Sequence, residues 1–167
     1  MKKLHTTDTT VASDFYHHYH EDIKFMKECG LKSFRFSISW ARIFPNGNGQ
    51  INQQGIDFYN DVINELIRND IVPIVTLFHF DLPQGLIDQC KGFFSRQCIE
   101  DFVNYARVCF ESFGDRVPYW LAINEQDVIA NIPFFNGLTD IKKSMQTNHH
   151  MNIFALLFVL IYEDYLK

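Results

Sequence analysis

The feature that most constrains the fold is a ten-residue apolar run, IVPIVTLFHF, at residues 71–80. A nearly continuous apolar run of this length is typical of a parallel strand that is covered on both faces. Helical periodicity lies on either side of it: residues 55–69 carry apolar side chains at helical spacing, and a second such pattern follows Ser95. We therefore expect helices and strands to alternate around this run, as they do in α/β proteins.

Two more strands are expected. Residues 33–40 alternate with period two, so that the aromatic residues take one face and Arg35 the other. Residues 119–125 form a short apolar strand that ends in Asn124 and Glu125. Polar residues at the carboxyl ends of strands fit both (β/α)8 barrels and doubly wound sheets. No glycine-rich phosphate loop follows a strand, which argues against a nucleotide-binding sheet.

Start and stop signals place two of the helices. Asp14 is expected to cap a helix over residues 15–29. Ser95 is expected to cap another helix, which Gly114 ends.

A last helix is expected over residues 148–165, and residues 153–162 within it form a continuous apolar run. This run is shorter than the roughly 20 residues that a bilayer requires, so we interpret it as part of a core helix. Apolar residues all round a helix call for cover on every face, and few residues follow to supply it. We expect part of this helix to lack its covering partners.

Composition predicts one globular domain over residues 1–167, because 47% of the residues are hydrophobic and 21% are charged. A net charge of -5 gives no reason to expect nucleic acid or an anionic membrane as a partner. The histidines at residues 17–20 and 149–150 lack the spacing of a known metal site, and we expect neither a metal nor a cofactor.

The cysteines bear on the compartment. They show no paired CxxC spacing, and residues 1–6 run into polar residues without a secretory pattern. We therefore expect free thiols and a cytoplasmic location. The four cysteines are Cys29, Cys90, Cys98 and Cys109.

Glu125 lies where an apolar strand meets solvent. A carboxyl group beside aromatic and aliphatic neighbours is poorly hydrated, which favours its protonated form and suits a general acid. Asn124 beside it could hold a substrate hydroxyl. The alternative is a strand-end carboxylate that faces water, and position alone does not separate the two.

Other candidates carry two interpretations each. Arg35 either stabilises a catalytic carboxylate or forms a structural ion pair, and the residues alone favour the ion pair. His79 either binds sugar hydroxyls or is a structural hydrogen-bonding group, which is the more frequent case. Asp81 reads as the start of a loop. Trp40 and Phe80 either cover the apolar face of a sugar or belong to the core.

Three ordered motifs resemble the glycoside hydrolase family 1 β-glycosidases. They are FRFSISWARIFP at residues 34–45, TLFHFDLP at residues 76–83, and FGDRV at residues 113–117, which leads into Asn124 and Glu125. The resemblance covers about residues 14–128. Residues 129–167 match weakly, apart from NHHM at residues 148–151, which looks like the start of a later family helix.

The resemblance implies a (β/α)8 barrel, with this chain supplying about strands two to four without closing it. It also implies retaining hydrolysis of β-glycosides. By resemblance Glu125 is the acid/base, and Asn124 is the amide that binds the hydroxyl next to the reacting carbon. His79 is then a glycone-binding histidine and Arg35 an arginine beside the nucleophile, which replaces the structural interpretation of both.

The chain departs from the family in three places. Gln126 follows Glu125 where the family often has proline, a variant that looks more like the phospho-β-glucosidase branch. The family's first strand and its glutamine are not found before Asp14. Nothing after Val128 resembles the nucleophile motif, TENG.

The missing nucleophile limits what the chain can do, because a retaining glycosidase needs two carboxyls about 5–5.5 Å apart. Asp81 or Asp127 could be considered as a substitute, but neither has the family position. We therefore expect the chain alone to be inactive. In addition, a barrel of this type typically takes about 250 residues or more.

The sequence leaves three hypotheses. The first is part of a β-glucosidase or 6-phospho-β-glucosidase, with a β-glucoside or a phosphorylated β-glucoside as substrate. The second is a non-catalytic remnant that binds sugar or associates with a partner. The third is a truncated gene product without a function of its own. Open barrel edges and an uncovered apolar helix also predict self-association.

Overall fold

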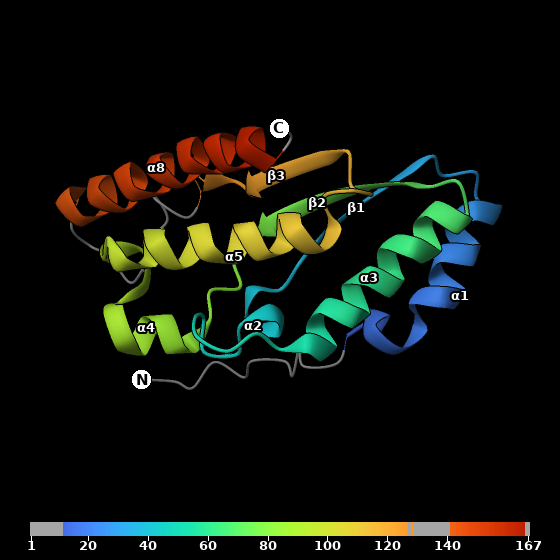
Figure 1. Cartoon of the computed structure of the whole chain (residues 1–167), viewed down its shortest axis with the longest axis horizontal. Coiled ribbons are helices and arrows are strands. Elements are labelled where there is room, and N and C mark those ends of the chain that lie inside the picture. Colours follow the sequence, from blue (N-terminus) through green and yellow to red (C-terminus); the bar gives the residue numbers. More distant parts are fainter. Residues whose placement is uncertain (1–11, 127, 129–140, 166–167) are drawn as a thin grey trace, which may run out of the picture.

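A computed structural model describes residues 12–126, 128 and 141–165. Its centre is a parallel sheet in the order β1-β2-β3 (Figure 1). The strands are β1 (Ser33–Ser37), β2 (Val72–Phe78) and β3 (Tyr119–Ile123). The sheet therefore has the three predicted strands in parallel order, and it does not close on itself within the described residues.

Four longer helices pack with the sheet. They are α1 (Phe15–Glu28), α3 (Gln53–Arg68), α5 (Gln97–Phe113) and α8 (Ile141–Tyr165). Since α3 connects β1 to β2 and α5 connects β2 to β3, each crossover is a βαβ unit. In Figure 1, α8 and α5 run alongside each other next to β3, whereas α1 and α3 lie together at the other end of the molecule. This is the architecture expected for part of a (β/α)8 barrel.

Three short helices were not predicted. They are α2 (Trp40–Ile43), α4 (Gln84–Cys90) and η1 (Gly92–Phe94). The predicted strand at residues 33–40 ends early because Trp40 turns into α2. The Trp40 side chain is fully buried, and its Nε1 donates to the carbonyl oxygen of Gly47 at 2.9 Å. Period-two alternation continued through residue 40, although the chain had already left the sheet.

Helix starts also differ from the expectation. Asp14 is the N-cap residue of α1, but it has a left-handed backbone and its side chain makes no capping hydrogen bond. The Asp14 carboxylate instead lies 2.7 Å from His17 Nδ1. The N-cap residue of α5 is Arg96 and not Ser95, although Ser95 Oγ accepts the backbone N–H of Gln97 at 3.1 Å.

The two faces of the sheet have different surroundings. Phe36, Val75 and Trp120 are aligned across the three strands and pack into the main core with the helices. On the opposite face Arg35, Ile74 and Tyr119 are aligned, and Tyr119 is 61% exposed. The helix-facing side of the sheet thus belongs to the main core, while no described helix covers Arg35 and Tyr119 on the other side.

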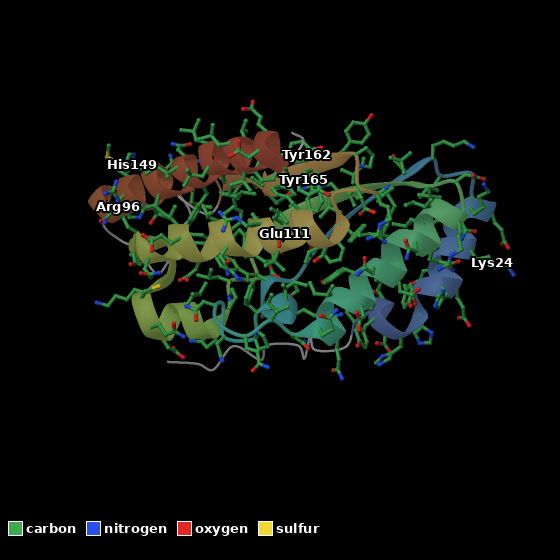
Figure 2. All side chains as sticks on the ribbon, viewed as in Figure 1. Lys24, Arg96, Glu111, His149, Tyr162 and Tyr165 are labelled. Atoms are coloured by element: carbon green, nitrogen blue, oxygen red, sulfur yellow. The ribbon has the colours of Figure 1, made fainter. Side chains whose placement is uncertain are left out.

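The terminal helix α8 is covered on one side only. Phe158 and Tyr162 pack against Phe110 of α5, with ring centroids 5.5 and 5.3 Å apart. Figure 2 shows Tyr162 and Tyr165 near the C-terminal end of α8, above Glu111 of α5. The opposite side exposes apolar residues: Leu156, Val159 and Leu160 are 67, 48 and 56% exposed. In the part of the chain that the structure describes, no helix is long and apolar enough to cross a membrane.

Two buried tyrosines tie the ends of the strands to the helices. The Tyr105 hydroxyl of α5 lies 3.1 Å from the carbonyl oxygen of Ile38 and 2.9 Å from that of Leu77. The Tyr59 hydroxyl of α3 accepts the backbone N–H of Ser39 at 2.7 Å. Burial raises the pKa of Tyr59 to about 12, so its hydroxyl stays neutral at physiological pH. These contacts fix the carboxyl ends of β1 and β2 relative to each other.

Asp81 joins the same junction just after β2. Its Oδ1 accepts the backbone N–H of His79 at 3.3 Å, and the side chain also accepts hydrogen bonds from Ser39 and Trp40. Burial raises the pKa of Asp81 above the ordinary value of 3.8, against the effect of these hydrogen bonds. The residue interpreted as a simple loop start is therefore a half-buried link between β2 and α2.

We expect Tyr105→Phe to destabilise the chain by about 1–3 kcal/mol, because two buried carbonyl oxygens lose a shared donor. The measurement is the free energy of unfolding in urea. Tyr119→Phe is the matched control, since the Tyr119 side chain is mostly exposed; it should change stability by less than about 0.5 kcal/mol. Equal effects of the two substitutions would show that the Tyr105 hydroxyl does not hold the junction.

The effects of Asp81 and Asp70 on the free energy of unfolding should depend on pH in opposite directions. Because the folded-state pKa of Asp81 is raised, its stabilising effect is present below pH 3.8 and is lost as pH rises through the folded pKa. The pKa of Asp70 is lowered by its hydrogen bond with Lys27, so its effect is present above pH 3.8 and is lost on acidification.

The measurement is the free energy of unfolding of the wild type, Asp81→Asn and Asp70→Asn between about pH 2.5 and 7. With rising pH, the advantage of the wild type over Asp81→Asn should fall, and its advantage over Asp70→Asn should grow. Slopes of the same sign for both variants would contradict the buried environment of Asp81.

Candidate active site

The predicted site residues lie on the open face and at the carboxyl ends of the strands. Arg35 lies on β1, His79 follows β2 directly, and Asn124 and Glu125 follow β3. Because the three strands are parallel, their carboxyl ends meet at the same edge of the sheet. The structure thus gathers residues that are up to 90 positions apart in the sequence.

Arg35 connects all three strands. Its Nε donates to Thr76 Oγ1 on β2 at 2.9 Å, and its Nη2 donates to Asn124 Oδ1 beyond β3 at 2.6 Å. The side chain is exposed, and both partners are neutral. The structural ion pair considered from the sequence is therefore absent within the described residues. Thr76 was not identified beforehand, although a polar residue inside an apolar strand was the available signal.

Asn124 is held on two sides. Its backbone N–H donates to the carbonyl oxygen of Phe78 at 2.9 Å, which extends the pairing of β2 and β3 by one residue. Its side-chain oxygen accepts from Arg35, and the residue is only 8% exposed. Since the oxygen is engaged, the Nδ2 group is what the side chain can offer to a ligand.

Glu125 follows with an unusual backbone. Its φ is +43°, in the left-handed region that residues other than glycine rarely adopt. Its carbonyl oxygen accepts the backbone N–H of Val128 at 3.0 Å. The side chain is exposed, so the poorly hydrated carboxyl expected from the sequence is wrong for this structure. The aromatic and aliphatic residues of β3 face the core or the open sheet face and do not cover the carboxyl.

Gln126 connects this strand end to α8. Its Nε2 donates to Asn148 Oδ1 at 3.1 Å and to Asn152 Oδ1 at 2.7 Å. The sequence showed only that Gln126 departs from the common proline. Its two partners lie more than twenty residues later, so no local pattern could reveal them.

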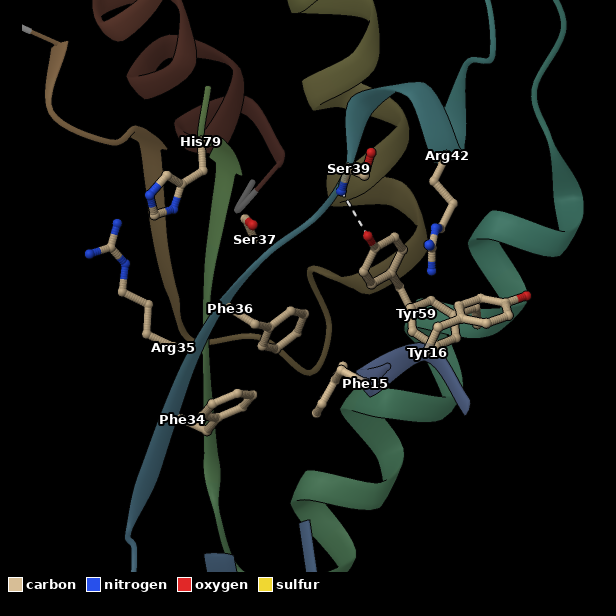
Figure 3. Close-up of a pocket in the computed structure, with 11 residues that line it drawn as sticks. Phe15, Tyr16, Phe34, Arg35, Phe36, Ser37, Ser39, Arg42, Tyr59 and His79 are labelled. Atoms are coloured by element: carbon tan, nitrogen blue, oxygen red, sulfur yellow. Dashed lines mark hydrogen bonds between the residues drawn. The ribbon is translucent and has the colours of Figure 1, made fainter. Parts of the chain in front are cut away.

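His79 stands on the same side of β1 as Arg35 (Figure 3). Its ring is exposed and meets the ring of Phe80 edge-on at 5.2 Å. Phe80 also has a left-handed backbone, with φ of +70°. Both strand ends that carry candidate residues therefore turn through a left-handed residue, a feature that is frequent at functional sites.

A groove of about 620 Å³ runs along the free edge of β1. Figure 3 shows Arg35 and His79 on one side of this strand, and Phe34, Phe36 and Tyr59 on the other. The groove thus joins the polar face of the sheet to an aromatic region over the helices. On the aromatic side the Arg42 guanidinium lies over two rings, those of Tyr16 and Phe58, at 4.3 and 4.8 Å from their centroids.

The remaining candidates have structural surroundings. Trp40 is fully buried and stacks on Tyr105 at 5.0 Å, so it belongs to the core and does not offer a face to a sugar. His17 and His20 lie beside carboxylates of α1 and α3. Within the described ranges, no three histidine, cysteine or acidic side chains gather as a metal site would require. Asp127 lies outside the described residues.

The geometry suits a ligand rich in hydroxyl groups. Asn124 offers an amide donor, His79 offers an imidazole, and Glu125 adds an exposed carboxyl that can give or take a proton. Sugar hydroxyls need neutral donors and acceptors of this kind. The described residues also place a fixed cation, Arg35, beside the amide.

The sequence of this chain is similar to those of known β-glucosidases. Beta-glucosidase 17 of Arabidopsis thaliana is 56% identical over 129 residues, which are 76% of this chain and 25% of that protein. An aryl-phospho-beta-D-glucosidase of Bacillus subtilis is 44% identical over 153 residues, 89% of this chain and 32% of that protein. The chain thus spans about a quarter to a third of the length of these curated relatives.

Solved structures agree in fold. A rice beta-glucosidase variant in a covalent complex with glucose superposes with a TM-score of 0.90 at 38% identity, over 95% of this chain and 37% of that one. A beta-glucosidase from Thermotoga maritima in complex with glucoimidazole gives 0.87 at 37% identity, over 92% and 36%. The family profile described as Glycosyl hydrolase family 1 matches residues 1–163. With nearly the whole sequence inside that match, the chain belongs to glycosyl hydrolase family 1.

Proposed function

We propose that this chain supplies the acid/base half of the active site of a retaining β-glucosidase. The observation that carries the proposal is the arrangement at the end of β3. Asn124 is locked by Arg35 and by Phe78, and the exposed carboxyl of Glu125 follows at once. A fixed amide beside a free carboxyl can bind one sugar hydroxyl and protonate the neighbouring glycosidic oxygen.

The reaction takes two steps. In the first, Glu125 gives its proton to the glycosidic oxygen while a second carboxylate attacks the anomeric carbon. The bond to the leaving group breaks and a glycosyl ester forms. In the second, Glu125 takes a proton from water, whose oxygen attacks the same carbon and releases the ester carboxylate. The covalent glucose complex of the rice relative is consistent with such an ester.

The other residues have supporting roles in this scheme. Asn124 Nδ2 donates to the hydroxyl next to the anomeric carbon, and His79 binds a more distant hydroxyl of the same sugar. Arg35, already bound to Asn124, holds positive charge where the attacking carboxylate must stay ionised. The sequence carries no motif for that carboxylate, so the chain on its own should not turn over substrate.

A phosphorylated β-glucoside is the second substrate class. It is supported by the relative of Bacillus subtilis named as an aryl-phospho-beta-D-glucosidase, and by Gln126 in place of the common proline. Asn124 and His79 would bind glucose and phosphorylated glucose in the same way, because the two sugars offer the same hydroxyls near the anomeric carbon.

We also propose a cytoplasmic location, which rests on the cysteines. Cys98 and Cys109 are buried free thiols, and burial raises the pKa of both. Cys29 and Cys90 are also free thiols, and free thiols are typical of a reducing compartment such as the cytoplasm.

The acid/base role can be tested in a complete barrel. The matching third of the Thermotoga maritima beta-glucosidase would be replaced by residues 12–163 of this chain, and a smaller exchange would transfer only residues 119–126. We expect both hybrids to hydrolyse an alkyl β-glucoside, whose leaving group must be protonated as it departs. Glu125→Gln should lower kcat/KM by about 10²- to 10⁴-fold, because general acid–base catalysis is lost.

Glu111→Gln is the control for the larger hybrid, since Glu111 is an exposed glutamate on α5. It should leave kcat/KM unchanged. A hybrid in which Glu125→Gln retains full activity would refute the role assigned to Glu125. For the isolated chain, saturable binding of a glucoside without hydrolysis in a calorimetric titration would exclude the third hypothesis, a truncated product without function.

Self-association should follow from the uncovered side of α8. We propose that Leu156, Val159 and Leu160 bury against another molecule when nothing else covers them. Light scattering after gel filtration should give a mass above that of the monomer. The double substitution Leu156→Glu and Leu160→Lys should shift the chain toward monomer, because it removes apolar surface and adds a favourable i,i+4 pair.

Phe25→Lys is the control for that measurement. Phe25 is 65% exposed on α1, away from α8, so its replacement removes a similar apolar group from another surface. An equal loss of association in both variants would mean that general surface hydrophobicity, and not α8, holds the molecules together.

A further inference from the structure

Gln126 bonds the end of β3 to the terminal helix at the point where the candidate acid lies. We propose that Gln126, Asn148 and Asn152 form an amide link that positions Glu125, so that α8 takes part in orienting the acid/base. The inference rests on the proposed function for its catalytic meaning. Its structural part can be tested without any activity.

The amide link uses both hydrogens of one side chain. The Gln126 Nε2 lies 3.1 Å from Asn148 Oδ1 and 2.7 Å from Asn152 Oδ1. The two asparagines are four residues apart, and such residues lie one above the other on the same face of a helix. A primary amide has two N–H donors, so each can serve one asparagine. Two directed bonds from one nitrogen fix its position better than a single bond would.

Glu125 lies between two tethered neighbours. Before it, Asn124 is held by the carbonyl oxygen of Phe78 and by Arg35. After it, Gln126 is held by the two asparagines. The left-handed backbone of Glu125, with φ of +43°, is sparsely populated for a residue with a side chain and persists only where its surroundings enforce it. The amide link is the restraint on the C-terminal side.

A proline at this position would work differently. Proline has no N–H donor to give to asparagine, and it drives the residue before it toward extended backbone. A left-handed Glu125 is therefore compatible with Gln126 and conflicts with proline. In this chain the direction of the Glu125 side chain depends on side-chain hydrogen bonds to α8, where the common proline would set it through the backbone.

The helix that receives the link is itself anchored. Met151 and Phe154 are fully buried, and His150 Nδ1 lies 2.8 Å from the carbonyl oxygen of Phe93. Phe158 packs against Phe110 of α5. These contacts fix the position of α8 relative to the end of β3. Asn148 and Asn152 therefore offer Gln126 acceptors in fixed positions.

Four variants of the full chain test the structural part by NMR. Asn152→Leu removes an acceptor at nearly constant size, and Asn152→Asp keeps an oxygen in the same place. Gln126→Pro removes the donor and imposes the proline restraint. Gln146→Leu is the matched control, because it removes an exposed amide from the same helix outside the link.

The readouts are hydrogen exchange of the Gln126 side-chain amide and the backbone coupling and Cα shift of Glu125. In Asn152→Leu the exchange should accelerate by about five- to tenfold, as expected for one lost hydrogen bond. Gln126→Pro should move the Glu125 signals toward extended values. Asn152→Asp and Gln146→Leu should match the wild type. Unchanged Glu125 signals in both Asn152→Leu and Gln126→Pro would overturn the proposal.

The catalytic part uses the larger barrel hybrid and two β-glucosides. An alkyl leaving group must be protonated as it departs, whereas 2,4-dinitrophenolate leaves without a proton. In Asn152→Leu, a misdirected Glu125 should lower kcat/KM for the alkyl glucoside by about tenfold or more. The value of kcat/KM for the dinitrophenyl glucoside should fall by less than about twofold. Asn152→Asp should have the kcat/KM of the unmodified hybrid for the alkyl glucoside.

Equal losses for both substrates would show that the amide link only supports the fold, and would reject a positioning role. An error in the proposed function would look different. In that case Glu125→Gln would leave the unmodified hybrid active on the alkyl glucoside, while the NMR result for the amide link would stand.

Discussion

The hydrogen bonds of Arg35 are the interaction on which the open face of this structure depends. A single guanidinium reaches from β1 to Thr76 on β2 and to Asn124 beyond β3. Parallel strands that are bonded only to their neighbours can shift slightly relative to one another, and a side chain that spans all three limits such shifts. Because a guanidinium is always charged, Arg35 also gives this face a fixed positive centre.

The opposite face of the sheet reaches the same strand ends from the helices. Tyr105 and Tyr59 bind the carboxyl end of β1 from α5 and α3, and Asp81 links the end of β2 to α2. These groups are neutral or have a pKa shifted toward the neutral form, as their buried surroundings require. The polar groups on the helix-facing side of the sheet thus fix the backbone. The polar groups on the open face, Arg35 among them, remain accessible to a ligand.

The sequence predicted what depends on local patterns. Periodicity located the three strands and the long helices, and the polar residues after β2 and β3 pointed to the site. Contacts between distant residues were not predictable in this way. Thr76 became the partner of Arg35 only through strand register, and Asn152 meets Gln126 only because α8 folds back over β3. The exposure of Glu125 differed from expectation for a related reason: apolar neighbours in sequence point to the two faces of a strand and need not surround the residue that follows it.

The contrast between the two faces also bears on how the chemistry is divided. Among the described residues, Asn124 and Glu125 are oriented by the pairing of β3 with β2, by Arg35, and by the link from Gln126 to α8. The proposed reaction also needs a second carboxyl about 5–5.5 Å from the first, and the open side of the sheet is the side from which it can approach. If Glu125 is the acid, as proposed, the contacts that orient it belong to this part of the barrel. In the proposed reaction, exclusion of water from the open face would strengthen the electrostatic effect of Arg35 on a neighbouring carboxylate.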